Sequence, residues 1–180
     1  MNKLLVLGII SLTFFNCKSP EARRPITVTS GSFIDVSVER NKKLNEKEES
    51  LIESIISKDT TNEYIASENG FWYYYNTKIE NDSLTTPDFG DIVNFDYSTK
   101  RLDGSLIYSI EENKTHNYAM DQQELFTGLR EGLKLMKTGE TVTFLFPSQM
   151  AFGYYGDNNK IGSNVPLICE VTINSITENQ

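Results

Sequence analysis

The alternation of apolar and polar residues predicts several short strands in the second half of the chain. Between residues 92 and 98, Val93, Phe95 and Tyr97 share one face, and Asn94 and Asp96 share the other. A period of two is typical of a strand with one buried face. Alternation or short apolar runs bounded by turn residues predict further strands at 70–75, 106–108, 141–146 and 167–176.

Helical spacing predicts two helices. Apolar residues recur at this spacing from Leu51 to Ile56, behind a capping-box pattern of Asn45 and Glu48, so an amphipathic helix is expected over residues 46–57. Its apolar stripe favours a packing face over a partner-binding face. A second helix is expected within residues 124–136, followed by a stop at Gly139. Strands on both sides of one short helix favour an α+β domain, with an antiparallel β-sheet covering the helix.

The first sixteen residues resemble a bacterial lipoprotein signal. A basic start at Lys3 precedes an apolar run from Leu4 to Phe15, which ends just before Cys17. This run is too short to span a bilayer comfortably but suits the core of a signal peptide. In such signals the chain is cut before the cysteine, whose thiol then carries the lipid, and several acyl chains make the anchoring stable. The alternatives are an ordinary signal peptide with an incidental cysteine, or an uncleaved anchor.

Charge and composition exclude one class of partner. From Thr60 to Gln180 there are eight basic and seventeen acidic residues, a net charge of −9, whereas Lys18 to Asp59 is neutral. A nucleic-acid-binding protein needs a basic face to displace counterions from phosphates, so no nucleic-acid partner is expected. With 180 residues, ten Phe and nine Tyr, the chain has enough apolar material for one packed domain and a leader.

The second cysteine is expected to be a packed thiol. Cys169 lies in the alternating segment 167–173, on its predicted buried face. Because Cys17 ends an apolar leader and Cys169 lies within a strand, a disulfide between them is not expected. We therefore expect Cys169 to pack as a small apolar side chain, without a redox role.

A succession of short motifs runs through residues 70–177. They are Gly90-Asp91-x-Val93 leading to Tyr97, Leu102-Asp103-Gly104, Gly128-Leu129-Arg130-Glu131-Gly132-Leu133, Met136-Lys137-Thr138-Gly139-Glu140, Phe146-Pro147 and Ala151-Phe152-Gly153-Tyr154. Each motif alone is weak, but their succession is specific, and in order and spacing it resembles the FKBP-type peptidyl-prolyl cis/trans isomerase domain. The resemblance implies an FKBP-like fold, an antiparallel β-sheet wrapped around a short α-helix, here with an N-terminal helical extension.

Three further segments extend the comparison to the longer chain: Glu21-Ala22-Arg23-Arg24-Pro25-Ile26, 37–44 and Gly70-Phe71-Trp72-Tyr73. With them the chain is similar to a narrower group, the gliding-motility-associated lipoprotein isomerases of the Bacteroidetes envelope. This implies a folding helper in the periplasm, anchored to a membrane by its lipid and serving motility or secretion proteins. The chain then divides into a signal peptide (1–16), the lipidated Cys17 with a tether (17–32), a helical extension (33–69) and the isomerase domain (70–180).

Isomerisation of an Xaa-Pro bond passes through a twisted amide, whose carbonyl is less polar than that of the planar form. A dry apolar pocket favours this state, so no nucleophile, metal or cofactor is required. The lone histidine, His116, is expected to be solvated and inert. The resemblance implies catalytic roles for Tyr97, Ile107, Tyr108 and Phe152, and substrate-binding roles for Tyr118, Leu125, Phe126, Leu129, Ile161 and Cys169. The backbone of Leu125 corresponds to a group that holds the substrate.

Three positions depart from the family pattern. Leu129 stands where Trp is usual on the pocket floor, and Tyr108 replaces the wall Asp whose carboxylate orients the pocket tyrosine. Gly162 replaces a proline after Ile161, which implies a looser loop above the pocket. Tyr108 is still expected to donate a hydrogen bond. These changes put the rate in question more than the ligand, which is an Xaa-Pro segment of an envelope protein.

Three functions compete on this sequence. The first is an active isomerase of the cell envelope. The second is a non-catalytic chaperone or binding module that keeps the FKBP fold, of which the changes at Tyr108, Leu129 and Gly162 would be the mark. The third is a structural subunit of an envelope machine, held through the helix at 46–57. The oligomeric state is left open.

Overall fold

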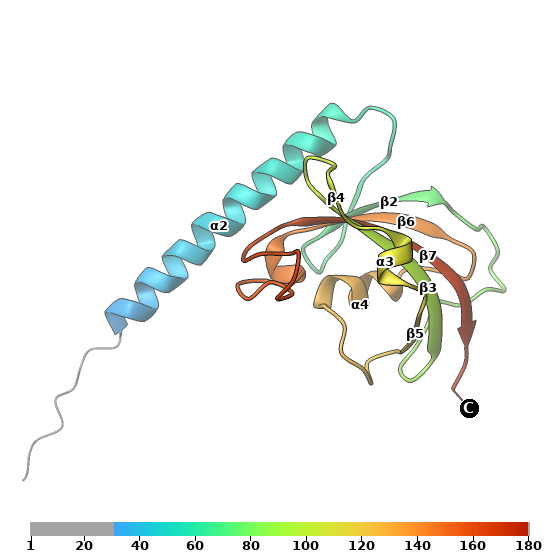
Figure 1. The fold of residues 1–180 in the computed structure, drawn as a ribbon. Helices are drawn as coiled ribbons and strands as arrows, with labels where there is room; N and C mark the ends of the chain where they lie inside the picture. The colour runs from blue at the N-terminus through green and yellow to red at the C-terminus, as the bar shows by residue number, and fades with distance from the viewer. Residues whose placement is uncertain (1–30, 180) are drawn as a thin grey trace, which may run out of the picture. The chain divides into compact units, whose positions relative to one another are not determined.

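The computed structural model describes residues 31–179, and the predicted signal peptide, Cys17 and most of the tether lie outside this range. The chain divides into two units, residues 1–36 and 37–180. The described elements (Figure 1) are α2 (Gly31–Lys58), β1 (Ile65–Ala66), β2 (Trp72–Thr77), β3 (Ile92–Arg101), β4 (Leu106–Tyr108), α3 (Ile110–Asn113), β5 (His116–Ala119), α4 (Thr127–Leu133), β6 (Thr141–Phe146), the 3₁₀ helix η2 (Ser148–Met150) and β7 (Leu167–Thr177).

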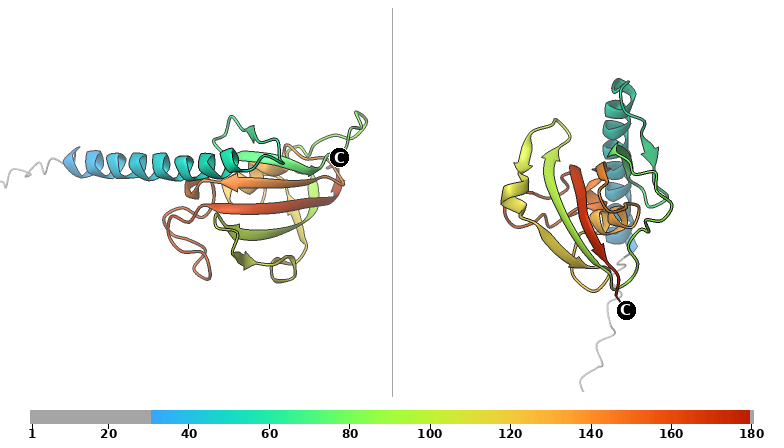
Figure 2. Two further views of the ribbon diagram at one scale, coloured as in Figure 1. Left: turned by 90° about the horizontal axis from the view of Figure 1, so that it is seen from above. Right: turned by 90° about the vertical axis from the view of Figure 1, so that its right-hand side faces the viewer.

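The seven strands form one antiparallel sheet in the order β1-β2-β6-β7-β3-β4, with β5 also paired to β3. The left view of Figure 2 shows the long strands side by side. β3 and β7 pair over their whole length, from Ile92 opposite Thr177 to Arg101 opposite Leu167. The longest pairing in the sheet therefore joins two segments far apart in sequence.

The other edge of β3 is divided between two partners. β5 pairs with Ile92–Phe95 and β4 with Thr99 and Lys100. The short helix α3 fills the space between them, and the side-chain amide of Asn113 donates to the carbonyl oxygen of Tyr97 at 2.9 Å. A backbone acceptor that no strand reaches is thus satisfied by a side chain.

The core lies between the sheet and α4. Leu129 and Leu133 of α4 and Phe144 and Phe146 of β6 are fully buried. Gly128 permits the closest approach, because a Cβ atom there would lie 2.5 Å from Cδ1 of Phe146. The α+β architecture expected from the sequence, an antiparallel sheet around a short helix with an N-terminal helix, is confirmed.

Both helices differ in length from the prediction. α2 begins at Gly31, so Asn45 is not an N-cap, and the carboxylate of Glu48 is hydrogen-bonded elsewhere. α4 covers only Thr127–Leu133, because Phe126 before it is extended (φ −64°, ψ 145°). No helix of residues 31–179 combines the length and apolar character needed to span a membrane.

A buried carboxylate fastens α2 to the 3₁₀ helix η2, which follows β6. Glu48 is 3% exposed, and it accepts hydrogen bonds from the backbone N–H of Ser148 at 2.7 Å and from its hydroxyl at 2.8 Å. Ile52, one turn further along α2, is completely buried. Leu51 on the same predicted stripe is 47% exposed. The stripe is therefore a packing face, as expected, but a narrower one than its apolar residues suggest.

We predict that Glu48→Ala lowers the free energy of unfolding by about 1–3 kcal/mol, because the N–H and hydroxyl of Ser148 lose their buried acceptor. Chemical denaturation followed by circular dichroism measures this change. Glu49→Ala, at the exposed neighbouring position, is the matched control and should shift stability by less than about 0.5 kcal/mol. Equal effects of the two substitutions would show that Glu48 does not fasten the helix.

Candidate functional site

An open cavity of about 590 Å³ lies beside α4, at one end of the core. The residues that line it come from β3, from the segment before α4, from α4 itself and from the loop after η2. They are Tyr97, Gln123, Glu124, Leu125, Phe126, Arg130 and Phe152. The open end of the core is thus an apolar recess with polar groups at its margin.

The predicted site residues fall into three groups. Tyr97, Leu125, Phe126 and Phe152 line the cavity directly. Tyr108 is partly buried and packs against the core cluster. The remaining members belong to the buried core cluster beside the cavity: Ile107, Tyr118, Leu129, Ile161 and Cys169.

Tyr97 lies in the part of β3 between the residues that pair with β5 and those that pair with β4. Burial first, and then the neighbouring Cys169, Tyr108 and Asp157, raise its pKa to about 12, so the phenol keeps its proton at neutral pH. Within residues 31–179 its hydroxyl has no hydrogen-bond partner. The proton is therefore available to a ligand in the cavity.

Aromatic rings form the apolar walls. The ring centres of Phe126 and Phe152 lie 5.0 Å apart, and those of Phe126 and Phe146 lie 5.6 Å apart in an edge-to-face arrangement. Such contacts favour fixed ring positions. The recess therefore has walls whose shape is set before a ligand enters.

The segment before α4 is held by Tyr118 and Gln123. The hydroxyl of Tyr118 donates to the carbonyl oxygen of Gln123 at 3.2 Å, and the side-chain oxygen of Gln123 accepts from the N–H of Ala119 at 3.2 Å. The N–H of Leu125 makes no hydrogen bond to any of the residues that the structure describes. It is thus an unpaired donor in a residue that lines the cavity.

Charges at the margin are tied to one another. Arg130 lies 3.5 Å from a carboxylate oxygen of Asp121 and 3.3 Å from one of Glu131, and Lys134 lies 3.1 Å from Asp121. These partly exposed pairs contribute little stability individually, but together they fix the orientation of Arg130. In the part of the chain from 31 to 179, no group of three or more His, Cys, Asp or Glu side chains is arranged to bind a metal ion.

Cys169 is a packed thiol, as the alternation predicts. It is completely buried, and this burial raises the pKa of the thiol to about 12. The thiolate, the reactive form, is therefore scarce at neutral pH.

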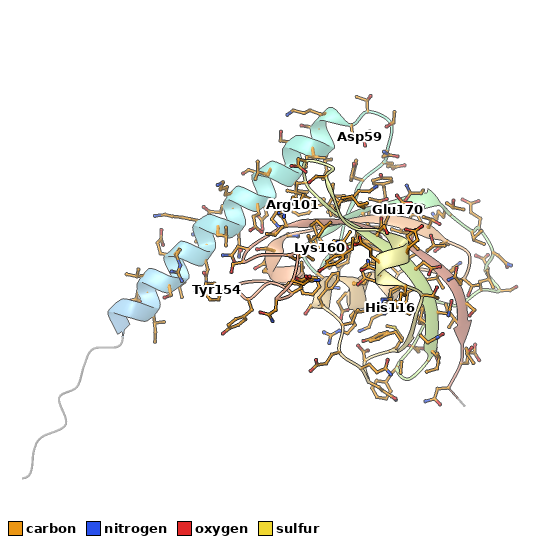
Figure 3. All side chains as sticks on the ribbon, viewed as in Figure 1. Asp59, Arg101, His116, Tyr154, Lys160 and Glu170 are labelled. Atoms are coloured by element: carbon orange, nitrogen blue, oxygen red, sulfur yellow. The ribbon has the colours of Figure 1, made fainter. Side chains whose placement is uncertain are left out.

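His116 is not the solvated residue expected from its polar surroundings. It lies opposite Phe95 in the β3–β5 pair, and its ring stacks on Phe95 with ring centres 5.3 Å apart and lies 5.4 Å from that of Tyr97. His116 is one of the side chains labelled in Figure 3. Its Nε2 is inaccessible and has no partner among residues 31–179. The prediction failed because strand β5 was not recognised. Its two-residue period places His116 on the same face as the buried Tyr118.

The sequence prediction also missed Asp157 and Lys160, which surround Tyr108. The Tyr108 hydroxyl donates to Asp157 at 2.5 Å and accepts from the backbone N–H of Lys160 at 3.2 Å. The run Gly156-Asp157-Asn158-Asn159 has the composition of a tight turn, but nothing in it indicates that the turn reaches β4. Gln123, Glu124 and Arg130 were likewise missed as cavity residues.

This arrangement suits recognition of an apolar ring next to an amide. The walls offer apolar and aromatic surface, while the Tyr97 hydroxyl and the Leu125 N–H offer two donors for carbonyl oxygens. Such a recess excludes water from the bound group.

Solved structures share this fold. A peptidyl-prolyl cis-trans isomerase from Pseudomonas syringae superposes with a TM-score of 0.60 at 18% identity, over 76% of this chain and 96% of that one. FkpA from Escherichia coli superposes with a TM-score of 0.58 at 20% identity, over 98% of this chain and 83% of that one. At these identities the similarity shows the fold alone.

Sequence comparison is more specific. A protein of Neisseria meningitidis named "Probable FKBP-type peptidyl-prolyl cis-trans isomerase FkpA" is 31% identical over 87 residues, 48% of this chain and 32% of that protein. Human peptidyl-prolyl cis-trans isomerase FKBP9 is 26% identical over 85 residues, 47% of this chain and 15% of that protein. The chain thus spans a third or less of the length of these relatives. Residues 84–174, half of the chain, match the family described as FKBP-type peptidyl-prolyl cis-trans isomerase. The chain belongs to this family.

Proposed function

We propose that this chain is a peptidyl-prolyl cis/trans isomerase that acts on Xaa-Pro segments of proteins in the bacterial cell envelope. The observation that supports it most directly is the cavity itself. Aromatic walls meet the protonated Tyr97 phenol and the free Leu125 N–H, in a chain that belongs to the isomerase family.

The proposed mechanism needs no covalent chemistry. Rotation about a peptide bond has a barrier of about 18–20 kcal/mol because the planar amide is stabilised by resonance. Phe126 and Phe152 surround the prolyl ring, and the apolar recess disfavours the polar, hydrated planar amide more than the twisted one. The Leu125 N–H holds a substrate carbonyl, while Tyr97 donates a hydrogen bond beside the rotating bond. Cis and trans forms then exchange faster without a change in their ratio.

The location of the protein is part of the proposal. A leader that ends at Cys17 supports lipidation there, and the tether that follows would place the domain on the periplasmic side of a membrane. Similarity to lipoprotein isomerases associated with gliding motility supports clients among motility or secretion proteins.

A second function has one structural observation in its favour. The Tyr108 hydroxyl, at a position implied to be catalytic, donates to Asp157 and not toward the cavity. A pocket with one donor fewer fits a chaperone or binding module that holds prolyl segments without accelerating their rotation. Such a protein would suppress aggregation of an unfolded client while leaving the isomerisation rate unchanged.

We predict that the purified chain accelerates cis/trans exchange of a short prolyl peptide, and that Tyr97→Ala lowers kcat/KM at least about tenfold through loss of a wall and a donor. A coupled assay or NMR exchange spectroscopy measures the rate. Tyr155→Ala is the matched control, because Tyr155 is 84% exposed on the nearby loop and does not line the cavity.

The parent rate separates the two functions. Acceleration that Tyr97→Ala removes and Tyr155→Ala keeps supports the isomerase. A parent without acceleration that still suppresses aggregation of an unfolded protein supports the chaperone and rejects the enzyme.

For the anchor, we predict that the chain expressed in a bacterial host with lipoprotein processing fractionates with membranes, and that Cys17→Ser moves it to another fraction or leaves an unprocessed precursor. Mass spectrometry of the mature N-terminus shows whether the cysteine is acylated. Cys169→Ser is the control, because that thiol is buried. An unmodified Cys17 in the membrane fraction would contradict lipidation.

A further inference from the structure

One carboxylate next to the pocket comes from an unexpected segment. Asp157 lies in the loop between η2 and β7. Its Oδ2 accepts the hydrogen bond of the Tyr108 hydroxyl at 2.5 Å. Its Oδ1 accepts from the backbone N–H groups of Asn159 and Ile161, each at 2.8 Å. A single side chain therefore joins the end of β4 to the turn that leads to Ile161.

The turn closes tightly around this carboxylate. The N–H of Asp157 donates to the carbonyl oxygen of Ile161 at 3.0 Å. Gly156 has a positive φ of 67°, and a Cβ atom there would lie 2.2 Å from the same carbonyl oxygen, so the closure requires glycine. Ile161 at the end of the turn is only 3% exposed and belongs to the core cluster beside the cavity. The looser loop expected from Gly162 is therefore held just before that residue.

Lys160 supplies a second link between the same segments (Figure 3). Its Nζ donates to the carbonyl oxygen of Ile107 at 3.2 Å, pairs with Glu112 of α3, and lies 4.8 Å from the centre of the Tyr108 ring. Because the ion pair of Lys160 with Glu112 is half exposed, it holds the loop more weakly than the hydrogen bonds of the Asp157 carboxylate do.

The hydroxyl hydrogen of Tyr108 is used in the hydrogen bond to Asp157 and is not available to a substrate. A phenol has one hydrogen to donate, and here Asp157 accepts it. Partial burial, and then this hydrogen bond, raise the pKa of Tyr108, so it stays protonated. Burial opposes ionisation of Asp157, but the hydrogen bonds from Tyr108 and from the N–H groups of Asn159 and Ile161 outweigh it and lower the pKa of Asp157. A neutral phenol thus donates to a charged carboxylate, the stronger kind of hydrogen bond.

We infer that Asp157 is a positioning residue of the prolyl pocket, which acts through Tyr108 to hold the turn 156–161 against β4 and so to place Ile161 beside the bound prolyl ring. Tyr108 bridges the wall and the carboxylate and does not donate to the substrate. Of these two tyrosines, Tyr97 is the one whose hydroxyl donates to the substrate. This inference rests on the proposed function, because it assumes that the cavity binds a prolyl segment.

Asp59 provides a matched control within the same chain. It also accepts a tyrosine hydroxyl, that of Tyr64 at 2.9 Å, and the backbone N–H of a short turn, that of Thr61 at 2.9 Å. It lies just after α2 and does not line the cavity. Asp157→Asn and Asp59→Asn thus remove the same charge from the same local motif at two places.

The experiment uses the full chain in mild detergent and compares the parent with Asp157→Asn, Tyr108→Phe, their double variant and Asp59→Asn. Isomerisation of a prolyl peptide gives kcat and KM, NMR gives hydrogen exchange at the Ile161 amide, and circular dichroism confirms that all variants are folded. We expect Asp157→Asn to lower kcat/KM about tenfold, mainly through a higher KM, because pocket shape affects substrate and transition state alike. Exchange at Ile161 should accelerate.

Coupling between the residues is the readout that a general loss of stability would not produce. Tyr108→Phe should cause a similar loss, and the double variant no further loss, because each change breaks the same link. Asp59→Asn should leave kcat/KM and Ile161 exchange at the parent values. Unchanged kcat/KM in Asp157→Asn, additive losses in the double variant, or an equal loss in Asp59→Asn would each overturn the inference.

A parent chain without isomerase activity would reject the proposed function. The positioning role of Asp157 would then be tested separately. NMR titration with the same prolyl peptide then measures affinity in place of kcat/KM. Weaker peptide binding and faster Ile161 exchange in Asp157→Asn and Tyr108→Phe, but not in Asp59→Asn, would uphold the positioning role. Parent-like values for both would reject it.

Discussion

The pairing of β3 is the constraint from which the pocket follows. β7 occupies one edge of β3 from Ile92 to Arg101, but the other edge is shared by β5 and β4, which leave a stretch between them unpaired. Backbone groups in such a stretch need other partners, and Asn113 supplies one at the carbonyl oxygen of Tyr97. The pocket tyrosine therefore lies where the sheet has no continuous edge. In this stretch of β3, which neither β4 nor β5 pairs with, Tyr97 lines the cavity.

An open core end has to keep its shape without the neighbours that a closed core would provide. The aromatic ring of Phe126 packs on the rings of Phe152 and Phe146. Around them the polar groups are bound to one another, Arg130 to Asp121 and Glu131 on one side and Tyr108 to Asp157 on the other. Few groups must then be reordered when a ligand enters, which lowers the entropic cost of binding. The isomerase that we propose acts by the shape and dryness of its site, without proton transfer, and gains most from this.

Residue patterns predicted those parts of the fold that depend on local periodicity. Alternation identified β3, β6 and β7, and it placed Val93, Phe95, Phe144 and Cys169 on the buried side, where the structure has them. Motif spacing identified the family and four cavity residues. The failures have a common cause in long-range contacts. Glu48 was assigned to a local cap but binds Ser148, one hundred residues away. His116 was predicted to be solvated because the short strand β5 forms by pairing with β3, and its own sequence does not indicate a strand. Asp157 contacts Tyr108 of β4. The composition of its segment predicts a turn, but not which strand the turn contacts.

Transfer of functional residues from a family motif assumes that a given chemical group stays on the same segment. At Tyr108 the assumption fails in an instructive way. An aspartate side chain is short and places its charge next to its own strand, whereas a tyrosine carries its hydroxyl several bonds further from β4. A carboxylate that meets this hydroxyl must come from another segment, and the turn at Gly156 brings one within reach. The charge still acts on Tyr97, whose pKa is raised by burial and then by Cys169, Tyr108 and Asp157. Tyr108, Gly156 and Asp157 therefore act together: the turn at Gly156 places the Asp157 carboxylate against the Tyr108 hydroxyl. Replacing Tyr108 by the aspartate of the family pattern would put two carboxylates on the same side of the pocket, so activity need not improve when the sequence is made more typical.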